Sequence, residues 1–545
     1  MTLISRPLPA LFNGVSQQPA TLRLESQLED QVNCLSTVVD GVVKRPPFQM
    51  VAKVSDNSLA ESAFIHTINR DTTERYIVVI TNGNLQVFDQ NGVEQTVTFP
   101  EGTAYLAASD PQQSFAVVSI ADYSFVVNRS ITVATKSAPT SEPPGFINWF
   151  APNTWFREGT LSNTQYFNAA QGSYRGTVQL FEDLPSPGDD TPPAEGDTYK
   201  VAGFDQNSFG AFYVVFRGGV WEETHEPGAS TALDEMTMPH ALVRQADGTF
   251  EFTQFAWTAR QFGDDESNPP PSFVGNRIND VLYYKNRLGF IADENVVFSG
   301  AGDFGNFWRT TVTDLLDSDV VDVAVSSTKV SLLNYAVPFN NNLMLFADQT
   351  QFALNVDELL TPSTVSIDTV TDYEMNVRVR PVAIGNDVYF VTESGNYSRV
   401  REYFVEDGKN QTEAADITAH VPRYLPRGMI QLAGNANEDI LFGISENEGE
   451  RHRIYVYKFF WNEQGKAQSA WSYWELDAND RVISISDLEN QIFALIERTD
   501  GVYLERADVQ SGVSATGLDF DVLLDRRVEV TGVYNTTADT TTFTL

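Results

Sequence analysis

The sequence is poor in the residue types that serve disulfide formation and much of enzyme catalysis. Its 545 residues include one cysteine, Cys34, and five histidines that are scattered along the chain. A single cysteine cannot close an intrachain disulfide, which argues against a secreted disulfide scaffold. No histidine lies in the sequence context of a cysteine protease. We therefore interpret Cys34 as a small residue of a hydrophobic core.

Basic residues are also scarce. The chain has 36 Lys and Arg against 73 Asp and Glu, and its formal net charge is −37. The densest basic run is Lys44-Arg45, which is too short to form the basic patch of a sequence-specific nucleic-acid-binding protein. Such a charge repels polyanions at long range. It suits a wall past which DNA slides without binding, and it equally suits a surface that only keeps the protein soluble.

Long apolar segments are missing as well. No stretch approaches the roughly 18 uninterrupted apolar residues of a membrane-spanning helix. The first nine residues lack the apolar core of a signal peptide. We therefore expect the chain to be made and folded in a cytoplasm.

Catalytic motifs are not found. The sequence contains no P-loop, no Gly-x-Ser-x-Gly elbow, no His-Glu-x-x-His and no Cys-x-x-Cys. Four aspartates, Asp314, Asp317, Asp319 and Asp322, could offer oxygen ligands to Ca²⁺, but they lack the central glycine and final glutamate of an EF-hand loop. We favour turn and strand-end roles for them. No residue is assigned to a catalytic, cofactor or metal site, no cofactor is expected, and the protein is predicted not to be an enzyme.

A glycan-degrading site is the enzymatic alternative. Glycoside hydrolysis needs two carboxylates about 5–10 Å apart, and Trp461, Trp471 and Trp474 could stack on sugar rings. With 73 acidic residues, some pair meets that distance by chance. Tryptophans at strand spacing more often fill a core, so this signal is weak.

Short apolar runs separated by turn residues dominate the sequence, which is the pattern of β-strands. Many runs come in pairs around Asn-Gly, Asp-Gly or Ser-Gly turns, which favour tight hairpins. The expected hairpins pair 77–80 with 85–88, 115–120 with 124–127, 281–284 with 288–291, 343–346 with 351–354, 388–391 with 397–400, 440–444 with 454–459, and 492–496 with 502–505.

The spacing of these pairs predicts an irregular β-propeller. After residue 280 they recur every ~45–60 residues, about the length of one four-stranded blade. A row of β-sandwiches would repeat at about 100 residues. Six or seven blades fit, and WD40 and kelch signatures are not found.

The repeat breaks where prolines and glycines cluster, and this break sets the expected domain map. We expect an N-terminal arm with the first propeller or platform strands at 1–60 and blades at 61–135. An inserted β-rich domain is expected at 136–275 and further blades at 276–510. The start of a C-terminal β domain, incomplete as given, is expected at 511–545.

Short sequence islands carry a family resemblance. They occur at 13–19 (Asn-Gly-Val-Ser-Gln-Gln-Pro), 44–47, 65–71, 121–129, 238–244, 271–290, 322–326, 335–339 and 416–422. In this order they resemble the tail tubular protein B, or nozzle, family of short-tailed bacteriophages. The islands span most of the chain, and together they are specific.

The resemblance implies a late structural protein of the virion. Its subunits would form a ring, by resemblance a hexamer, at the distal end of the tail. The implied partners are the tail adaptor (tail tubular protein A), the tail fibres, viral DNA in transit during genome ejection, and the host envelope. A receptor-binding adhesin and a tail-associated glycan hydrolase are the alternatives.

Three further hypotheses concern charge and gating. Many of the excess acids would face the channel, because each phosphate contact would slow ejection. The acidic segment 182–197 is a candidate plug or else a surface loop. The N-terminal basic residues Arg6, Arg23, Lys44 and Arg45 could dock an acidic neighbour, although ordinary solvated charge is favoured.

Overall fold

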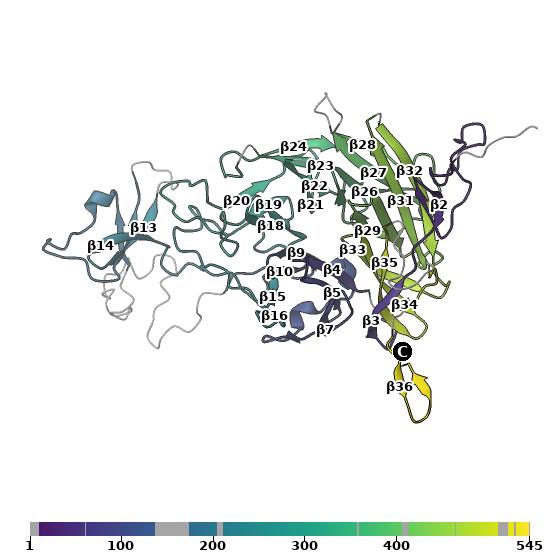
Figure 1. The fold of residues 1–545 in the computed structure, drawn as a ribbon. Coiled ribbons are helices and arrows are strands. Elements are labelled where there is room, and N and C mark those ends of the chain that lie inside the picture. The colour runs from purple at the N-terminus through teal and green to yellow at the C-terminus, as the bar shows by residue number, and fades with distance from the viewer. Residues whose placement is uncertain are drawn as a thin grey trace, which may run out of the picture.

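The computed structural model describes residues 10–59, 62–136, 174–203, 211–339, 341–356, 359–405, 412–463, 465–510, 522–527 and 530–543. Figure 1 shows a ring of sheets, an arm that extends from it to the left, and a hairpin that projects below it. The described helical elements are single turns: η1 (Ala104–Leu106), α1 (Pro111–Ser114) and η3 (Phe181–Asp183). None of them has the length or apolarity to cross a membrane.

Seven sheets surround one axis as the blades of a propeller (Figure 1). Blades 1 to 3, from the inner strand outwards, are β4 (Phe64–Asn69), β5 (Arg75–Thr81), β6 (Asn84–Asp89) and β7 (Glu94–Gln95); β9 (Phe115–Ile120), β10 (Tyr123–Asn128), β15 (His240–Arg244), β16 (Phe250–Gln254) and β8 (Val97–Thr98); and β17 (Asp280–Tyr284), β18 (Arg287–Ala292), β19 (Asn295–Phe298) and β20 (Val321–Ala324).

Blades 4 to 7 follow the same order. They are β21 (Leu333–Phe339), β22 (Asn342–Ala347), β23 (Gln351–Asn355) and β24 (Ser366–Thr371); β25 (Val382–Ile384), β26 (Asp387–Ser394), β27 (Tyr397–Val405) and β28 (Thr412–Asp416); β29 (Met429–Asn435), β30 (Ile440–Ser445), β31 (Arg453–Asn462) and β32 (Gly465–Glu475); and β33 (Arg481–Leu488), β34 (Gln491–Arg498), β35 (Gly501–Asp508) and β3 (Gln49–Ser55).

The inner strands close a complete circle. Each one contacts the next in the order β4, β9, β17, β21, β25, β29, β33 and back to β4. The described chain therefore holds seven blades, the larger of the two predicted numbers. The hairpins predicted from turn chemistry are confirmed as antiparallel pairs.

The hydrophobic core is divided into seven clusters, one at each junction between neighbouring blades. Phe290, Phe346, Phe442 and Phe493 are fully buried at four of these junctions. Because each sheet packs on both faces, central strands such as β18 are continuous apolar runs rather than alternating ones. Burial of each large side chain contributes about 1.5–3 kcal/mol to this packing.

The ring is closed by strands from the two ends of the chain. The N-terminal strand β3 pairs antiparallel with β35, and the other three strands of this blade, β33 to β35, come from the C-terminal part of the chain. Beside this pair, the Arg45 guanidinium donates to both carboxylate oxygens of Asp525 at 2.8 and 2.5 Å, and the Phe48 N–H donates to the same carboxylate at 3.0 Å. Closure therefore depends on contacts between residues that are very distant in sequence.

The arm is a separate four-stranded sheet inserted between β10 and β15 of blade 2. Its strands are β11 (Tyr174–Val178), β12 (Thr198–Val201), β13 (Phe212–Arg217) and β14 (Val220–Thr224), with β11 parallel to β12. Leu184, Val201 and Val214 form its small buried core. Figure 1 places β13 and β14 at the end of the molecule opposite blades 5 to 7.

The sheet pairing also bears on the expected insert at 136–275. Within that interval, β15 pairs with β10 and β16 pairs with β15, so both strands continue blade 2. The arm opens this blade in the middle, which hides the blade repeat in the sequence. We propose that the arm proper ends before β15.

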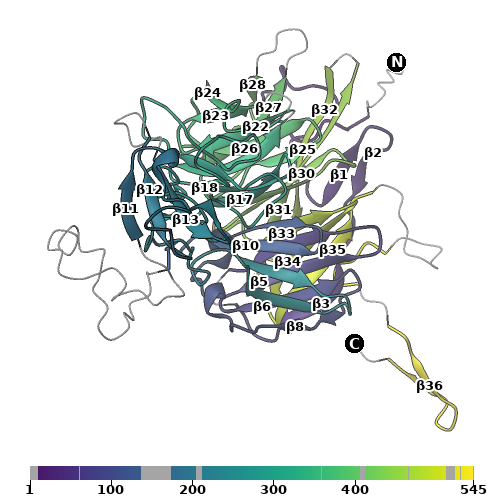
Figure 2. The ribbon, with the colours of Figure 1, turned by 90° about the vertical axis from the view of Figure 1, so that its left-hand side faces the viewer.

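Two hairpins lie outside the seven blades. One is β1 (Cys34–Thr37) with β2 (Gly41–Lys44), and β1 contacts β31 and β32 of blade 6. The other is β36 (Val533–Asn535) with β37 (Thr540–Thr542), which projects away from the ring (Figure 2).

Candidate functional site

The ring axis is where polar side chains from different blades meet. Gln431 on β29 illustrates the contacts: its Oε1 accepts hydrogen bonds from the Ile485 N–H and the Ser484 hydroxyl, both at 3.0 Å, and its Nε2 donates to the Ile485 carbonyl at 2.6 Å. Other side-chain hydrogen bonds between neighbouring blades or the segments leading into them are Thr67 to Asp487, His66 to Ser119, Ala336 to Asp280, Tyr335 to Val377, and Asn376 to Met429. Together with the Gln431 contacts, these bonds cross six of the seven junctions between neighbouring blades.

Further polar contacts link blades that are not neighbours. The Gln112 amide, between blades 1 and 2, donates to Gln431 of blade 6 at 3.1 Å. Arg380, before blade 5, forms an ion pair with the fully buried Asp280 of blade 3. Arg129, after β10, lies 5.0 Å from the ring centre of Tyr335 in blade 4. These contacts cross the space that the inner strands enclose.

The charge on Arg380 also affects His66. Burial is the larger cause and the Arg380 charge the smaller one, and together they lower the pKa of His66 to about 4. The imidazole is therefore neutral at neutral pH. It makes a 2.8 Å hydrogen bond to the Ser119 hydroxyl, which joins blades 1 and 2.

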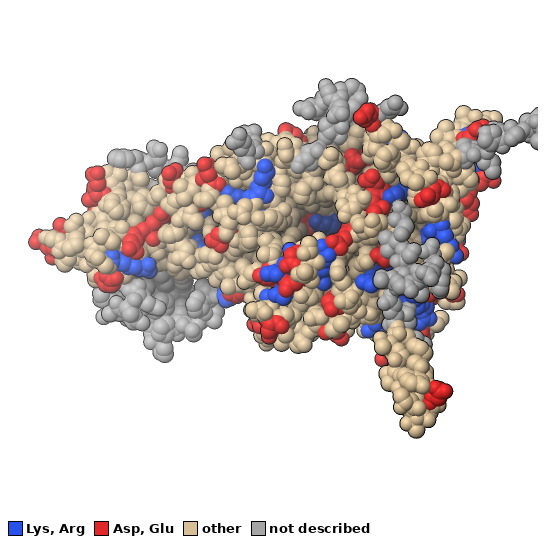
Figure 3. Space-filling view, viewed as in Figure 1, with Lys and Arg blue, Asp and Glu red and all other residues tan. Residues whose placement is uncertain are grey.

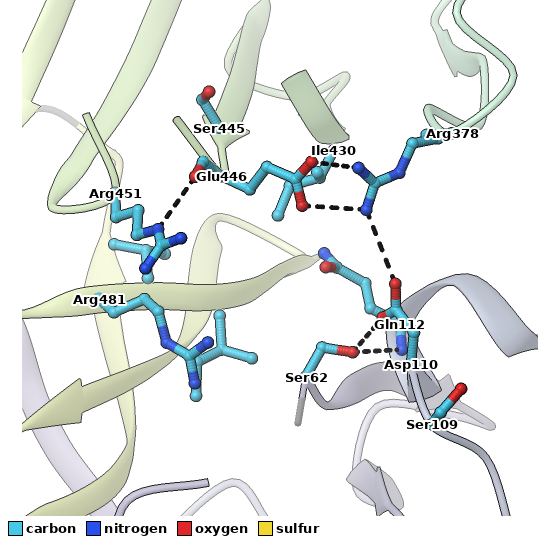
Figure 4. Close-up of a pocket in the computed structure, with 12 residues that line it drawn as sticks. Ser62, Ser109, Asp110, Gln112, Arg378, Ile430, Ser445, Glu446, Arg451 and Arg481 are labelled. Carbon is cyan, nitrogen blue, oxygen red and sulfur yellow. Dashed lines mark hydrogen bonds and ion pairs between the residues drawn. The ribbon is translucent and has the colours of Figure 1, made fainter. Parts of the chain in front are cut away.

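A pocket of about 250 Å³ opens beside the segments that lead into the inner strands, where blades 1, 2, 5, 6 and 7 approach one another. Its charged and polar lining includes Ser62, Asp110, Arg378, Glu446, Arg451 and Arg481 (Figure 4). The face in Figure 3 is also hollowed near the middle of the ring, and a basic side chain lies within the hollow.

The pocket holds three arginines and two carboxylates. Arg378 binds Glu446 through both guanidinium nitrogens and lies 3.6 Å from Asp110. Arg451 donates from Nε to the Glu446 carbonyl at 2.9 Å. Arg481 is anchored outside the pocket by Glu497 at 2.6 Å. Both carboxylates are thus engaged by Arg378.

This geometry is too narrow for duplex DNA. The major groove of B-DNA alone is about 12 Å wide, whereas hydrogen bonds of about 3 Å connect blades 2 and 6 across the axis. The axis of a single propeller is therefore closed to DNA.

The raised pKa values of two carboxyl groups have structural causes. Burial raises the pKa of Asp487 to about 6. Burial and then the charge of Glu402 raise the pKa of Asp387 to about 6. Glu402 is itself buried and bound by Tyr389 at 2.6 Å and by Lys466. These acids do not line the pocket, and Glu402 is not accessible to a substrate.

The predicted aspartate cluster is dispersed over several turns. Asp319 is buried and accepts hydrogen bonds from Thr310 and from the Leu316 N–H. Asp322 accepts from the Ser272 N–H and the Asn295 amide. Within the described residues, no group of three or more His, Cys, Asp and Glu side chains is arranged to hold a metal ion.

The other residues considered from sequence have mainly structural environments. Trp471 and Trp474 are buried, and their indole N–H groups donate to the carbonyls of Ile417 and Cys34. Trp461 is partly exposed beneath the Lys466 ammonium. Cys34 is partly buried, and burial raises the pKa of its thiol.

The basic N-terminal residues and the acidic loop are also held within the chain. Arg45 is buried against Asp525, Arg23 pairs with Glu29, and Arg6 lies outside the described residues. In the segment 182–197, Asp197 binds Arg175, and the Trp221 indole donates to the Pro185 carbonyl. This loop is fixed on the arm sheet, away from the axis of its own propeller.

The residues at the axis could not be recognised from the sequence. Gln431 and Glu446 belong to blade 6, whereas Arg378 precedes blade 5 and Asp110 precedes blade 2, and they share no local motif. The one signal available was that inner strands carry polar residues such as Ser484, whose neighbours are apolar.

A closed β-propeller with a polar, occluded axis and an inserted arm defines a mainly β structural protein. The chain belongs to the bacteriophage nozzle protein family, whose model matches residues 1–148 and 153–545. It is similar to tail tubular protein gp12 of Escherichia phage T7, with 30% identity covering 99% of this chain and 77% of that protein. The protein is a structural component of the distal tail in the phage virion, as the sequence islands indicated.

Comparison with solved structures gives weaker likenesses. The Kluyveromyces lactis Hsv2p structure covers 59% of this chain and 79% of its own, at a TM-score of 0.32 and 9% identity. A chain in the structure of Kap60 bound to yeast RCC1 (Prp20) matches 47% of this chain over 65% of its own length, at a TM-score of 0.27 and 11% identity. Likeness at this level defines neither a shared site nor a shared function.

Proposed function

We propose that this chain forms the wall of a ring, as a hexamer, through which the phage genome leaves the tail. The observation that carries this proposal is the occluded axis of the single propeller. Since contacts between the segment before blade 2 and blade 6, and between blades 3 and 5, cross that axis, duplex DNA needs a different path. A path enclosed by several copies of the chain meets this requirement.

The composition supports such a path. With a net charge of −37, the chain repels DNA, and contacts to phosphate are what retain DNA on a protein surface. We propose that many of the excess acids face the shared lumen. A potential map of the assembled ring that showed a neutral or basic lumen would contradict this part of the proposal.

Closed rings are built from heterologous interfaces, in which one face of a subunit meets a different face of the next. The arm and the projecting β36–β37 hairpin give the chain such unlike faces (Figure 2). We further propose that the ring joins the tail adaptor, contacts the tail fibres and meets the host envelope during infection. It acts as a conduit without a catalytic step of its own.

Electron microscopy of the purified full chain, combined with light scattering, tests this proposal. The expected result is a closed ring of sixfold symmetry with one central lumen and six occluded propellers around it. A chain that remains monomeric when mixed with the adaptor, or a ring whose lumen is too narrow for duplex DNA, would contradict it.

A further inference from the structure

The pocket between blades 1, 2, 5, 6 and 7 is lined by more basic than acidic side chains, although the chain as a whole is acidic. Acids outnumber bases by 73 to 36 overall, whereas the pocket has three arginines and two carboxylates. Both carboxylates are occupied by Arg378, and Asp110 also accepts a hydrogen bond from Ser62. Both carboxylates are therefore already engaged, although the single Arg378 charge offsets only one of their two negative charges.

Two guanidinium groups remain on the other side of the pocket. Figure 4 shows Arg451 and Arg481 facing the open space across from Arg378 and Glu446. Among the described residues, the Arg451 guanidinium donates from Nε to the Glu446 carbonyl, which leaves its two terminal nitrogens available to a ligand. Arg481 is held in place by Glu497 and by the Leu59 carbonyl at 3.0 Å.

We propose that this pocket binds an oxyanion, either a phosphate group or a carboxylate, between Arg451 and Arg481. Guanidinium groups recognise both through paired N–H donors in a fixed fork. A volume of about 250 Å³ holds about eight waters at roughly 30 Å³ each, enough for a phosphate or a short dicarboxylate.

The position of the site gives it a structural consequence. Arg481 begins the inner strand of blade 7, and Arg451 precedes β31 in blade 6. A bound oxyanion would therefore connect blade 6 to blade 7, the blade in which the N-terminal strand β3 closes the ring. This inference does not depend on ring assembly, because every residue involved belongs to one chain.

Calorimetric titration of the full chain at low ionic strength tests the proposal, with inorganic phosphate and succinate as separate probes. At least one probe is expected to bind saturably, once per subunit. Arg451→Ala should weaken that binding at least tenfold, equivalent to about 1.4 kcal/mol. Preference for phosphate or for succinate would distinguish a phosphate ligand from an acidic protein side chain.

Arg217→Ala is the matched control, because Arg217 is an exposed arginine on β13 of the arm. Arg451→Lys keeps the positive charge but loses the paired N–H donors of the guanidinium, so this variant should bind the oxyanion more weakly than the wild type. The proposal is overturned if neither probe saturates at millimolar concentration. It is also overturned if Arg451→Ala binds like the wild type, or if Arg217→Ala weakens binding equally.

Discussion

The ring and the arm are built from the same unit, a four-stranded sheet, but they bury it differently. Each blade packs on both faces and shares an apolar cluster with each neighbour. The arm sheet has only Leu184, Val201 and Val214 in its core. Stability in the ring is therefore shared around a closed circle, whereas stability in the arm is local.

This difference has a functional meaning. In the proposed assembly, the closed circle of blades would give each subunit a rigid frame. An arm with a small core can change its surface without disturbing that frame. Substitutions confined to the ring or to the arm therefore test this comparison directly.

The largest effect is expected from Trp474→Ala at the junction of blades 6 and 7. Trp474 is fully buried, and its ring centroid lies 5.4 Å from that of Phe442 and 6.2 Å from that of Phe48. Truncation of such a side chain costs about 3–5 kcal/mol. Urea unfolding should show the loss in the main transition, while Trp461→Ala, at a half-exposed site, should change it by less than about 0.5 kcal/mol.

Arg45→Ala tests the closure of the ring. The substitution leaves the Asp525 carboxylate without its partner. Because Asp525 is partly exposed, we expect the loss of this largely buried ion pair to cost about 2–4 kcal/mol of unfolding free energy. The exposed neighbour provides the control variant, Lys44→Ala, which should unfold like the wild type.

The decrease of the unfolding free energy at acidic pH, which is the acid limb of the stability profile, should depend on the same ion pair. Burial raises the pKa of Asp525, but the hydrogen bonds and charge of Arg45 outweigh it, and the net pKa is lowered. The stabilisation is thus present at neutral pH and is lost as pH falls through the folded-state pKa. Arg45→Ala should flatten this acid limb, and an unchanged pH profile would contradict the assigned role.

Asp487→Asn should stabilise the ring by a smaller amount. Its carboxyl has a pKa of about 6 in the folded state against a reference value of 3.8. The folded protein then binds more protons than the unfolded chain between these values, so stability decreases as pH rises from about 4 to 6. The variant should be about 1–2 kcal/mol more stable at pH 7, after allowance for partial exposure. Both proteins should converge near pH 4 in chemical denaturation.

Trp221→Ala should have the smallest effect on the ring. Trp221 packs against Tyr199 and Phe216 on the arm, with ring centroids 5.5 and 5.2 Å away. Hydrogen exchange should increase in β12 to β14, while the main unfolding transition stays within about 0.5 kcal/mol. Loss of protection throughout the blades would show that arm and ring are one cooperative unit.

The contrast between ring and arm also explains what the sequence revealed. Hairpins such as β5–β6 were predictable because the apolar runs and the Asn-Gly turn are adjacent in sequence. The pairing of β10 with β15 was not predictable in this way, since the arm separates the two strands along the chain. Contacts such as Arg45 with Asp525 and Gln112 with Gln431 have no local pattern, because the fold alone brings them together.

Electron cryomicroscopy of particles arrested during genome ejection tests the central claim most directly. We predict continuous DNA density along the axis of the assembled ring, enclosed by subunits whose own propeller axes contain only side chains. DNA density within a propeller axis, or a tail in which this chain does not surround the DNA, would contradict the account.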